Sequence, residues 1–279
     1  MALRLLDAYL RRIGVADPGG RDIDSLRRLH TAHVDAIPFE NIDILLGRGI
    51  SLDLDHLRNK LIAQSRGGYC FEQNTLFLTV LRELGFTVSA MEARVRAGST
   101  DLRPRTHMIL SVEIDGESWL ADVGFGGEGL REPVPMEREQ AGSAPGIAYR
   151  VVRERDLRVM QMRRAGAWID QYAFLPHAVA PVDFEVANWY TSTYPRSPFV
   201  QTLTAQRSTP DVRYILRYPT YTEIRESSIS HRDIARSELV PILRDLFGIV
   251  LPPDTRFPVI DDPAASSNAV ALAFPRPAH

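Results

Sequence analysis

The chain contains a single cysteine, and the residues around it are typical of a reactive group. Cys70 is the only cysteine among 279 residues. Two glycines, Gly67 and Gly68, break the helical pattern that precedes it, and an apolar pattern of helical spacing restarts at Phe71, which places Cys70 at a helix N-terminus. The partial positive charge there favours thiolate over thiol. A lone thiol is either a small core residue or a nucleophile, and this position favours the nucleophile.

A histidine and an aspartate can meet across a β-hairpin. Residues 106–114 and 117–123 alternate as two strands, and Asp115-Gly116 between them is a strong signal for a two-residue turn. Counting outward from that turn places His107 diagonal to Asp122 on one face, at a backbone separation of about 7–8 Å. The opposite face is then uniformly apolar, which supports this register.

These three side chains together would form an activated nucleophile. A hydrogen bond to Asp122 would fix the tautomer of His107 and stabilise its imidazolium form, which in turn favours a Cys70 thiolate. The alternative is a satisfied sheet histidine, a surface carboxylate and a core cysteine. The glycine pair before the cysteine and the shared strand face favour chemistry. Without a second cysteine, the chain can form neither an intrachain disulfide nor a zinc site of several thiolates, and it has no resolving thiol for redox cycling.

The first two thirds of the chain predict helices followed by strands. Apolar residues recur at helical spacing through residues 1–85, with Asp24 as the expected N-cap of the second helix. From Phe86 the apolar period changes to two, and several short strand patterns follow. The middle third therefore predicts a small antiparallel sheet or barrel.

The last third is mixed. Beyond Asp183 the pattern predicts a short helix over residues 184–190, a strand near residues 199–203 and further strands. A final helix is expected from Ser237, and the tail from Pro252, rich in proline and alanine, is expected to be loosely packed.

Composition excludes several classes of partner. The chain has 33 basic and 35 acidic residues and no basic block, which argues against a nucleic-acid partner. No apolar run approaches the roughly 20 residues that span a bilayer, and charged residues interrupt the N-terminal apolar stretch, so we expect no membrane segment and a cytoplasmic location. The remaining histidines lack metal-ligand spacing, so no metal site is expected. Oligomeric state is left open.

Five segments resemble motifs of the arylamine N-acetyltransferases. They are RGGYCFEQN at 66–74, RTHM at 105–108, LADVGFG at 120–126, PFEN at 38–41 and STYPRSPF at 192–199. They occur in the family's order and the chain length matches, so the resemblance covers the whole chain.

The resemblance implies an α+β fold of three domains with a papain/transglutaminase-like cysteine catalytic core. Residues 1–85 would form a helical bundle that carries the nucleophilic cysteine, 86–190 an antiparallel β-barrel that carries the histidine and aspartate, and 191–279 an α/β lid with the C-terminal tail. The family's catalytic triad falls on Cys70, His107 and Asp122.

The resemblance also implies a ping-pong reaction without a permanently bound cofactor. Acetyl-CoA would acetylate Cys70, and an arylamine, arylhydrazine or arylhydroxylamine would then accept the acetyl group. The backbone N–H of Cys70 is an expected donor to the oxyanion. Because the chain has one lysine, arginines such as Arg196 or Arg225, or backbone groups, would have to bind the phosphates of CoA.

Aromatic walls are expected around the thiol, to exclude water and to stack on a flat amine. The expected side chains are Phe39, Tyr69, Phe125 and Phe199. By resemblance, the backbone near Gly126 and Gly127 would approach CoA, although a strand-ending turn explains these glycines equally well. An ion pair between Arg66 and Glu40 would support the cysteine loop.

Three other functions remain open at this stage. An amide synthase of the same family, which moves a polyketide chain from a carrier-protein thioester to an arylamine, would use the same triad. A cysteine hydrolase of the papain or transglutaminase type would use the same triad order. A ligand-binding or scaffold protein with an inert thiol is the non-enzymatic alternative.

Overall fold

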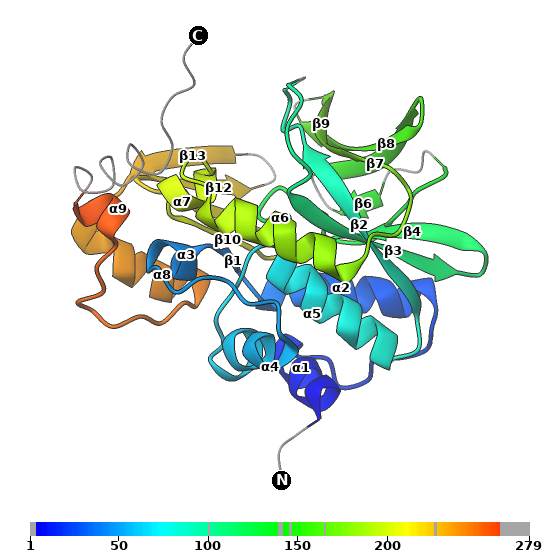
Figure 1. Cartoon of the computed structure of the whole chain (residues 1–279), viewed down its shortest axis with the longest axis horizontal. Coiled ribbons are helices and arrows are strands. Elements are labelled where there is room, and N and C mark those ends of the chain that lie inside the picture. The colour runs from blue at the N-terminus through cyan, green and yellow to red at the C-terminus, as the bar shows by residue number, and fades with distance from the viewer. Residues whose placement is uncertain are drawn as a thin grey trace.

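A computed structural model of the protein describes residues 4–99, 101–138, 142–144, 147–164, 166–225 and 228–262. Two antiparallel sheets lie side by side, and helices of the first third pack beneath them (Figure 1). None of the helices in these ranges is long and apolar enough to cross a membrane.

The first third is helical, as predicted. It contains α1 (Leu5–Ile13), α2 (Ile23–Ala36), a short strand β1 (Phe39–Glu40), α3 (Ile42–Leu45), α4 (Leu54–Leu57), a π-helix η1 (Arg58–Ala63) and α5 (Cys70–Glu83). The expected N-cap Asp24 is wrong. Asp22 caps α2 instead, because its carboxylate accepts the backbone N–H of Ser25 at 2.8 Å.

The middle third forms an eight-stranded antiparallel sheet in the order β5-β4-β3-β2-β9-β8-β7-β6. Its strands are β2 (Thr87–Val95), β3 (His107–Ile114), β4 (Glu117–Ala121), β5 (Val134–Pro135), β6 (Gly142–Ala144), β7 (Ile147–Glu154), β8 (Leu157–Arg164) and β9 (Ala167–Phe174). The sheet curls so that β5 approaches β7, which gives the expected barrel-like shape.

The predicted hairpin register is confirmed. Ile114 pairs with Glu117 and Leu110 pairs with Ala121, so the turn lies at Asp115-Gly116 as expected. The two faces of the hairpin belong to different cores. One face packs against the helices, α5 among them, and the face that bears Ile109 packs into the barrel. The hairpin therefore separates the helical layer from the barrel interior.

The last third completes a second sheet. It contains α6 (Pro181–Thr193), α7 (Pro198–Gln201), β10 (Thr204–Ser208), β11 (Arg213–Arg217), β12 (Thr220–Arg225), β13 (Ser228–Asp233), a 3-10 helix η2 (Arg236–Glu238), α8 (Leu239–Phe247) and α9 (Pro258–Asp261). The five strands run in the order β1-β10-β11-β12-β13. Strand β1 comes from the first third, so the two ends of the chain share a sheet. The predicted domain boundary after residue 190 falls inside α6.

Two expectations for this part are wrong. Residues 198–201 form α7 rather than a strand, because the Ser197 side chain caps its first turn and Pro198 occupies the first helical position. The tail from Pro252 is not loose as far as it is described. Phe257 is fully buried and Arg236 is paired with Asp261 at 2.5 Å. The remainder of that tail, residues 263–279, lies outside the described residues.

A chain of five buried charges connects β1 to the start of α5. Glu72 Oε1 lies 2.7 Å from Lys60 Nζ, which lies 2.8 Å from Asp43 Oδ2. Asp43 Oδ1 lies 3.3 Å from the Arg66 guanidinium, which reaches Glu40 at 2.6 Å. The predicted pair of Arg66 and Glu40 is therefore confirmed, as one end of a longer chain of alternating sign.

Each end of this charge chain also fixes the start of a helix. Glu72 Oε2 accepts the backbone N–H of Tyr69 at 3.1 Å, one residue before α5. Glu40 Oε2 accepts the N–H of Ile42 at 2.7 Å, at the first residue of α3. Buried charges stay ionised only when they are paired and hydrogen-bonded. The charge chain therefore holds the first turn of α5 at a fixed place relative to β1.

The charge chain contains three carboxylates and two cations, so one negative charge is in excess. The pKa of Glu72 reflects this excess. Burial raises the pKa of Glu72 to about 7, with Lys60 opposing the shift and Glu40 adding to it. Burial lowers the pKa of Lys60, but the three carboxylates outweigh it and hold that pKa above its ordinary value. The ammonium therefore stays charged while Glu72 is the carboxylate that takes up a proton most readily.

Replacing Lys60 by methionine is expected to lower the free energy of unfolding by about 3–5 kcal/mol, because two buried carboxylates lose their shared cation. Urea denaturation measures the change. Arg48→Met is the matched control: Arg48 lies 3.4 Å from the same Asp43, but its side chain is 59% exposed, so the expected loss is below about 1 kcal/mol. Equal losses in the two variants would contradict a stabilising role for the buried chain.

Candidate active site

Cys70 is the first residue of α5 and only 3% exposed, so the predicted helix N-terminus is confirmed. Its sulfur lies 3.8 Å from the carbonyl oxygen of Thr106, directly before β3. The end of β4 approaches the cysteine closely enough to require a glycine. A Cβ at Gly124 would lie 2.7 Å from the Cα of Cys70. The helix and the hairpin therefore meet at the thiol.

The prediction that the two glycines before Cys70 break the preceding helix is wrong. The preceding π-helix has already ended at Ala63, and Ser65 makes the turn with a φ of 52°. Gly67 is needed for space instead, since a Cβ there would lie 2.1 Å from the carbonyl oxygen of Pro38. Gly68 pairs with β1 in a parallel bridge, so the cysteine loop is joined to the second sheet.

His107 and Asp122 are in contact, as the register predicts. The Nε2 of His107 lies 2.7 Å from Asp122 Oδ2, and both side chains are almost fully buried. Cys70 also forms a hydrogen bond with this imidazole. Because Nε2 faces Asp122, Nδ1 is the ring nitrogen left for the sulfur. The structure therefore brings together all three residues of the expected triad.

The other oxygen of Asp122 is satisfied by two neutral donors. Oδ1 accepts hydrogen bonds from Asn74 Nδ2 and from the backbone N–H of Gly124, each at 3.0 Å. Asn74 also donates to the carbonyl of Met108 at 2.8 Å and accepts the N–H of Val123 at 3.1 Å. Asn74 follows Cys70 by one helical turn, so one face of α5 carries the thiol and fixes the hairpin beneath it.

His30 supports Asp122 from behind, a role that the sequence did not reveal. The backbone N–H of Asp122 donates to His30 Nε2 at 3.1 Å, so Nε2 carries no proton and Nδ1 donates to the carbonyl of Arg131. Burial lowers the pKa of His30 to about 4. His30 is therefore neutral, with a fixed tautomer. The only available signal was its position in an amphipathic helix, which does not indicate a partner 92 residues away.

A second neutral histidine supports the cysteine loop. His33 Nδ1 accepts from the hydroxyl of Tyr9 at 2.8 Å, and its Nε2 donates to Gln73 Oε1 at 3.2 Å. Burial lowers the pKa of His33 to about 3. Gln73 passes the support on, because its Nε2 donates to the carbonyl of Gly68 at 2.7 Å.

The electrostatics of the site favour a positively charged His107 and a negatively charged Asp122. Burial opposes a charged imidazole, but the Asp122 charge, their hydrogen bond and Cys70 outweigh it and raise the pKa of His107 to about 10. Burial would raise the pKa of Asp122, but His107 and the neutral donors lower it overall. The pair is an imidazolium and a carboxylate at neutral pH, which stabilises an anionic sulfur beside it.

A cavity of about 650 Å³ opens above the thiol and the imidazole. Phe39, Phe125 and Phe199 line it, as predicted, and the ring of Phe125 lies 5.1 Å from that of His107. Tyr69 does not line the cavity. It is fully buried, contacts Phe199 at a ring distance of 5.6 Å and donates to Asn188. Tyr69 precedes the helix with an extended backbone, and its side chain packs against α6 and Phe199 instead of into the cavity.

The structure gives no support to a CoA-binding role for Gly126 and Gly127. Neither lines the cavity. The N–H of Gly127 donates to Gln206 and its carbonyl accepts from Arg213, each at 2.5 Å. Gly126 has a φ of 94°, and a Cβ there would lie 2.6 Å from Gln206. The two glycines form a strand-ending turn that packs against the second sheet.

Three exposed arginines line the cavity, namely Arg103, Arg196 and Arg217. Arg196 is one of the two arginines named above as candidates for binding the phosphates of CoA. The other, Arg225, does not line the cavity and is paired with Glu223 at 2.6 Å. Across the described ranges, no group of three or more His, Cys, Asp or Glu side chains is arranged to hold a metal ion.

Comparison with known proteins gives a consistent result. A family model described as N-acetyltransferase matches residues 22–256. The arylamine N-acetyltransferase of Escherichia coli (strain K12) is 40% identical over 208 residues, which is 74% of this chain and 74% of that protein. That of Mycolicibacterium smegmatis is 37% identical over 253 residues, covering 88% of this chain and 92% of that protein. The solved structure of the Mycobacterium marinum arylamine N-acetyltransferase in complex with CoA matches with a TM-score of 0.84 and 33% identity, covering 88% of this chain and 92% of that one.

Replacing Asp122 by asparagine is expected to lower the pKa of His107, because burial then acts against the imidazolium without an adjacent carboxylate. Nitrogen-15 NMR of the histidine rings should show His107 titrating near pH 10 in the parent and well below that in the variant. His30 and His33 provide the internal control, since they stay neutral above about pH 5 in both proteins.

The same substitution has a stability consequence with a definite sign. The folded-state pKa of His107 is raised above the ordinary value of about 6.5, so the ion pair contributes fully below that pH and its contribution is lost as the pH approaches 10. Urea denaturation should therefore show a larger destabilisation by Asp122→Asn at about pH 6 than at about pH 10. An equal destabilisation at both values would contradict a charged pair.

Proposed function

The chain belongs to the arylamine N-acetyltransferase family, and we propose that it transfers the acetyl group of acetyl-CoA to arylamines, arylhydrazines or arylhydroxylamines through an acetyl-cysteine at Cys70. The observation that carries this proposal is the buried contact of His107 and Asp122, at 2.7 Å, beside the only thiol of the chain. The relatives from Escherichia coli and Mycolicibacterium smegmatis bear the name of this activity.

In the first half-reaction the Cys70 thiolate attacks the thioester carbonyl carbon of acetyl-CoA. The new carbon–sulfur bond to Cys70 forms, the bond to the CoA sulfur breaks, and the CoA thiolate leaves with a proton available from His107. Asp122 holds the imidazolium in the required orientation. The N–H of Cys70, at the first position of α5, has no acceptor within its own helix, and we assign it to the oxyanion.

In the second half-reaction the amine nitrogen attacks the acetyl carbon and Cys70 leaves as a thiolate. His107 takes the proton that the nitrogen loses, which restores the imidazolium. The acyl-enzyme must survive until the amine arrives, so water has to be kept out. Phe39, Phe125 and Phe199 supply apolar walls around the thioester and flat faces for an aromatic amine.

The exposed arginines that line the cavity provide a binding side for CoA. Arg103, Arg196 and Arg217 are exposed along its rim, and we assign the phosphates of CoA to this side, because guanidinium groups bind phosphate oxygens in a bidentate way. The CoA complex of the Mycobacterium marinum enzyme supports binding of this cosubstrate by the fold. No cofactor needs to stay bound between turnovers.

We further propose that the enzyme works in the cytoplasm, where a reactive thiolate is kept reduced. We also propose that the three expected units, 1–85, 86–190 and 191–279, act as domains whose junction is the active site. The support for this division is that the cysteine, the histidine–aspartate pair and the arginines at 196 and 217 come from three different parts of the chain.

Incubating the protein with acetyl-CoA in the absence of amine is expected to add one acetyl group, measured by intact mass. Addition of an arylamine such as anisidine should remove it, and Cys70→Ala should never acquire it. Asp122→Asn should be acylated at least tenfold more slowly, because thiolate formation loses the stabilised imidazolium. Acylation of Asp122→Asn at the parent rate would assign Asp122 a structural role only.

The same assay separates the remaining alternatives. Titration of the thiol after denaturation confirms that it was intact. An intact thiol that takes up no acetyl group would overturn the proposal; acylation only by long-chain thioesters would favour an amide synthase, and peptide cleavage without CoA-dependent acylation would favour a cysteine hydrolase. Slow alkylation of Cys70 throughout the neutral pH range would indicate an inert thiol.

A further inference from the structure

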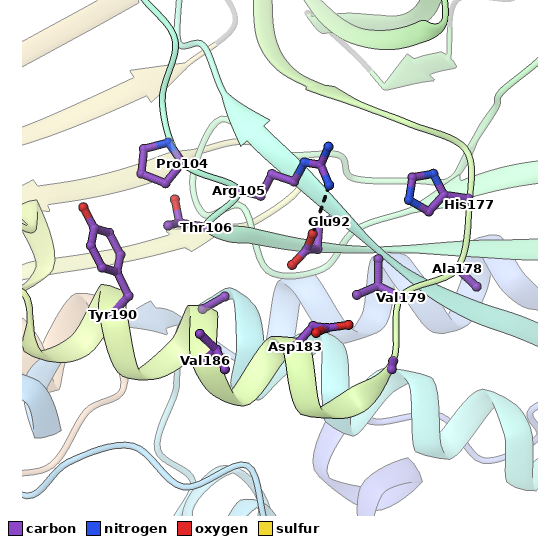
Figure 2. Close-up of a pocket in the computed structure, with 12 residues that line it drawn as sticks. Glu92, Pro104, Arg105, Thr106, His177, Ala178, Val179, Asp183, Val186 and Tyr190 are labelled. Carbon is purple, nitrogen blue, oxygen red and sulfur yellow. Dashed lines mark ion pairs between the residues drawn. The ribbon is translucent and has the colours of Figure 1, made fainter.

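A second cavity, of about 600 Å³, lies between α6 and the segment that leads into β3. Figure 2 shows Asp183, Val186 and Tyr190 of α6 along one side, and Pro104, Arg105 and Thr106 along the other. Glu92 of β2 lies between them, with Arg105 at 3.6 Å. The reaction proposed above assigns no role to this groove.

The groove adjoins the cavity of about 650 Å³ above the thiol, which is called the reaction cavity below. Pro104, Thr106 and Tyr190 line both cavities, so the two meet at these residues. The carbonyl of Thr106 is also the group 3.8 Å from the Cys70 sulfur. The groove therefore begins next to the thiol, at Thr106, and a ligand whose reacting atom lies at the Cys70 sulfur can extend past Thr106 into it.

The two cavities differ in charge. The reaction cavity is lined by three exposed arginines against one glutamate, Glu128, which is itself paired with Arg164. The groove is lined by the carboxylates of Glu92 and Asp183, by one guanidinium, Arg105, which lies 3.6 Å from Glu92, and by the imidazole of His177. Within the described part of the chain Asp183 forms no ion pair, and the remaining lining is largely alanine, valine and proline. Phosphates are repelled from such a surface and cations are attracted to it.

Resting on the proposed function, we propose that this groove is an acceptor subsite. It takes the distal part of an elongated arylamine that carries a positive charge at the end remote from the reacting nitrogen. Val186 and Tyr190 contact the apolar body of the substituent, and Glu92 and Asp183 face its cation. CoA and the acceptor then approach the same thiol from surfaces of opposite charge, which keeps the CoA phosphates out of the acceptor's path.

A pair of isosteric acceptors tests the proposal. One is a para-aminobenzamide whose amide nitrogen carries a trimethylammonioethyl group, and the other has carbon in place of the quaternary nitrogen. The expected kcat/KM is higher for the cationic compound. Glu92→Gln and Asp183→Asn should each reduce the cationic-to-neutral ratio of kcat/KM by about two- to fivefold, since partly exposed charge pairs contribute roughly 0.4–1 kcal/mol.

Two further variants keep the test decisive. Glu185→Gln removes an exposed carboxylate from the same helix without lining the groove, and should leave the ratio unchanged. Val186→Arg places a cation on the groove wall at a residue that is 65% exposed, and should lower the ratio without loss of fold. The same ratio in all four variants as in the parent, or no preference in the parent, would overturn the subsite while unsubstituted aniline is still acetylated. Failure with aniline as well would instead overturn the proposed function.

Discussion

The arrangement of this site depends on a carboxylate that has no access to water. Asp122 is 1% exposed, so its charge is tolerable only with close partners. The imidazolium of His107 supplies the opposite charge, and Asn74 and the Gly124 N–H satisfy the second oxygen. His30 binds its backbone. These partners come from α2, α5, β3 and the end of β4, so the helical layer, the hairpin and the nucleophile have to be packed together before the charge pair can exist.

A second set of buried charges fixes the thiol itself. The chain from Glu72 to Glu40 joins the first turn of α5 to β1, and β1 is the edge strand of the second sheet. The position of Cys70 is therefore tied to both sheets, to one by Asn74 and to the other by the charge chain. A thiol held from two sides keeps a fixed distance to His107, and that distance is what general acid–base catalysis requires.

Features encoded by neighbouring residues were predictable, and features that depend on distant packing were not. The Asp115-Gly116 turn determined which residues of the hairpin face each other, so His107 and Asp122 could be paired by counting. Only the Arg66–Glu40 end of the charge chain was predicted; Asp43, Lys60 and Glu72 join it from separate elements, and no local pattern indicates them. Tyr69 was misplaced because it is next to Cys70 in sequence but turned away from it. Ser197-Pro198 did carry a helix-start signal, which the apolar residues after it obscured.

The burial of Lys60 has a consequence for an enzyme that carries an activated acetyl group. Thioesters acylate lysine amines in their unprotonated form, and lysine is common at the surface of most proteins. This chain has one lysine, which is 4% exposed and held as an ammonium between Asp43 and Glu72. Its other basic side chains are arginines and histidines, and a guanidinium that stays protonated is not a nucleophile. The protein therefore has no lysine at its surface to intercept the acetyl group that it transfers, so self-modification at lysine does not compete with turnover.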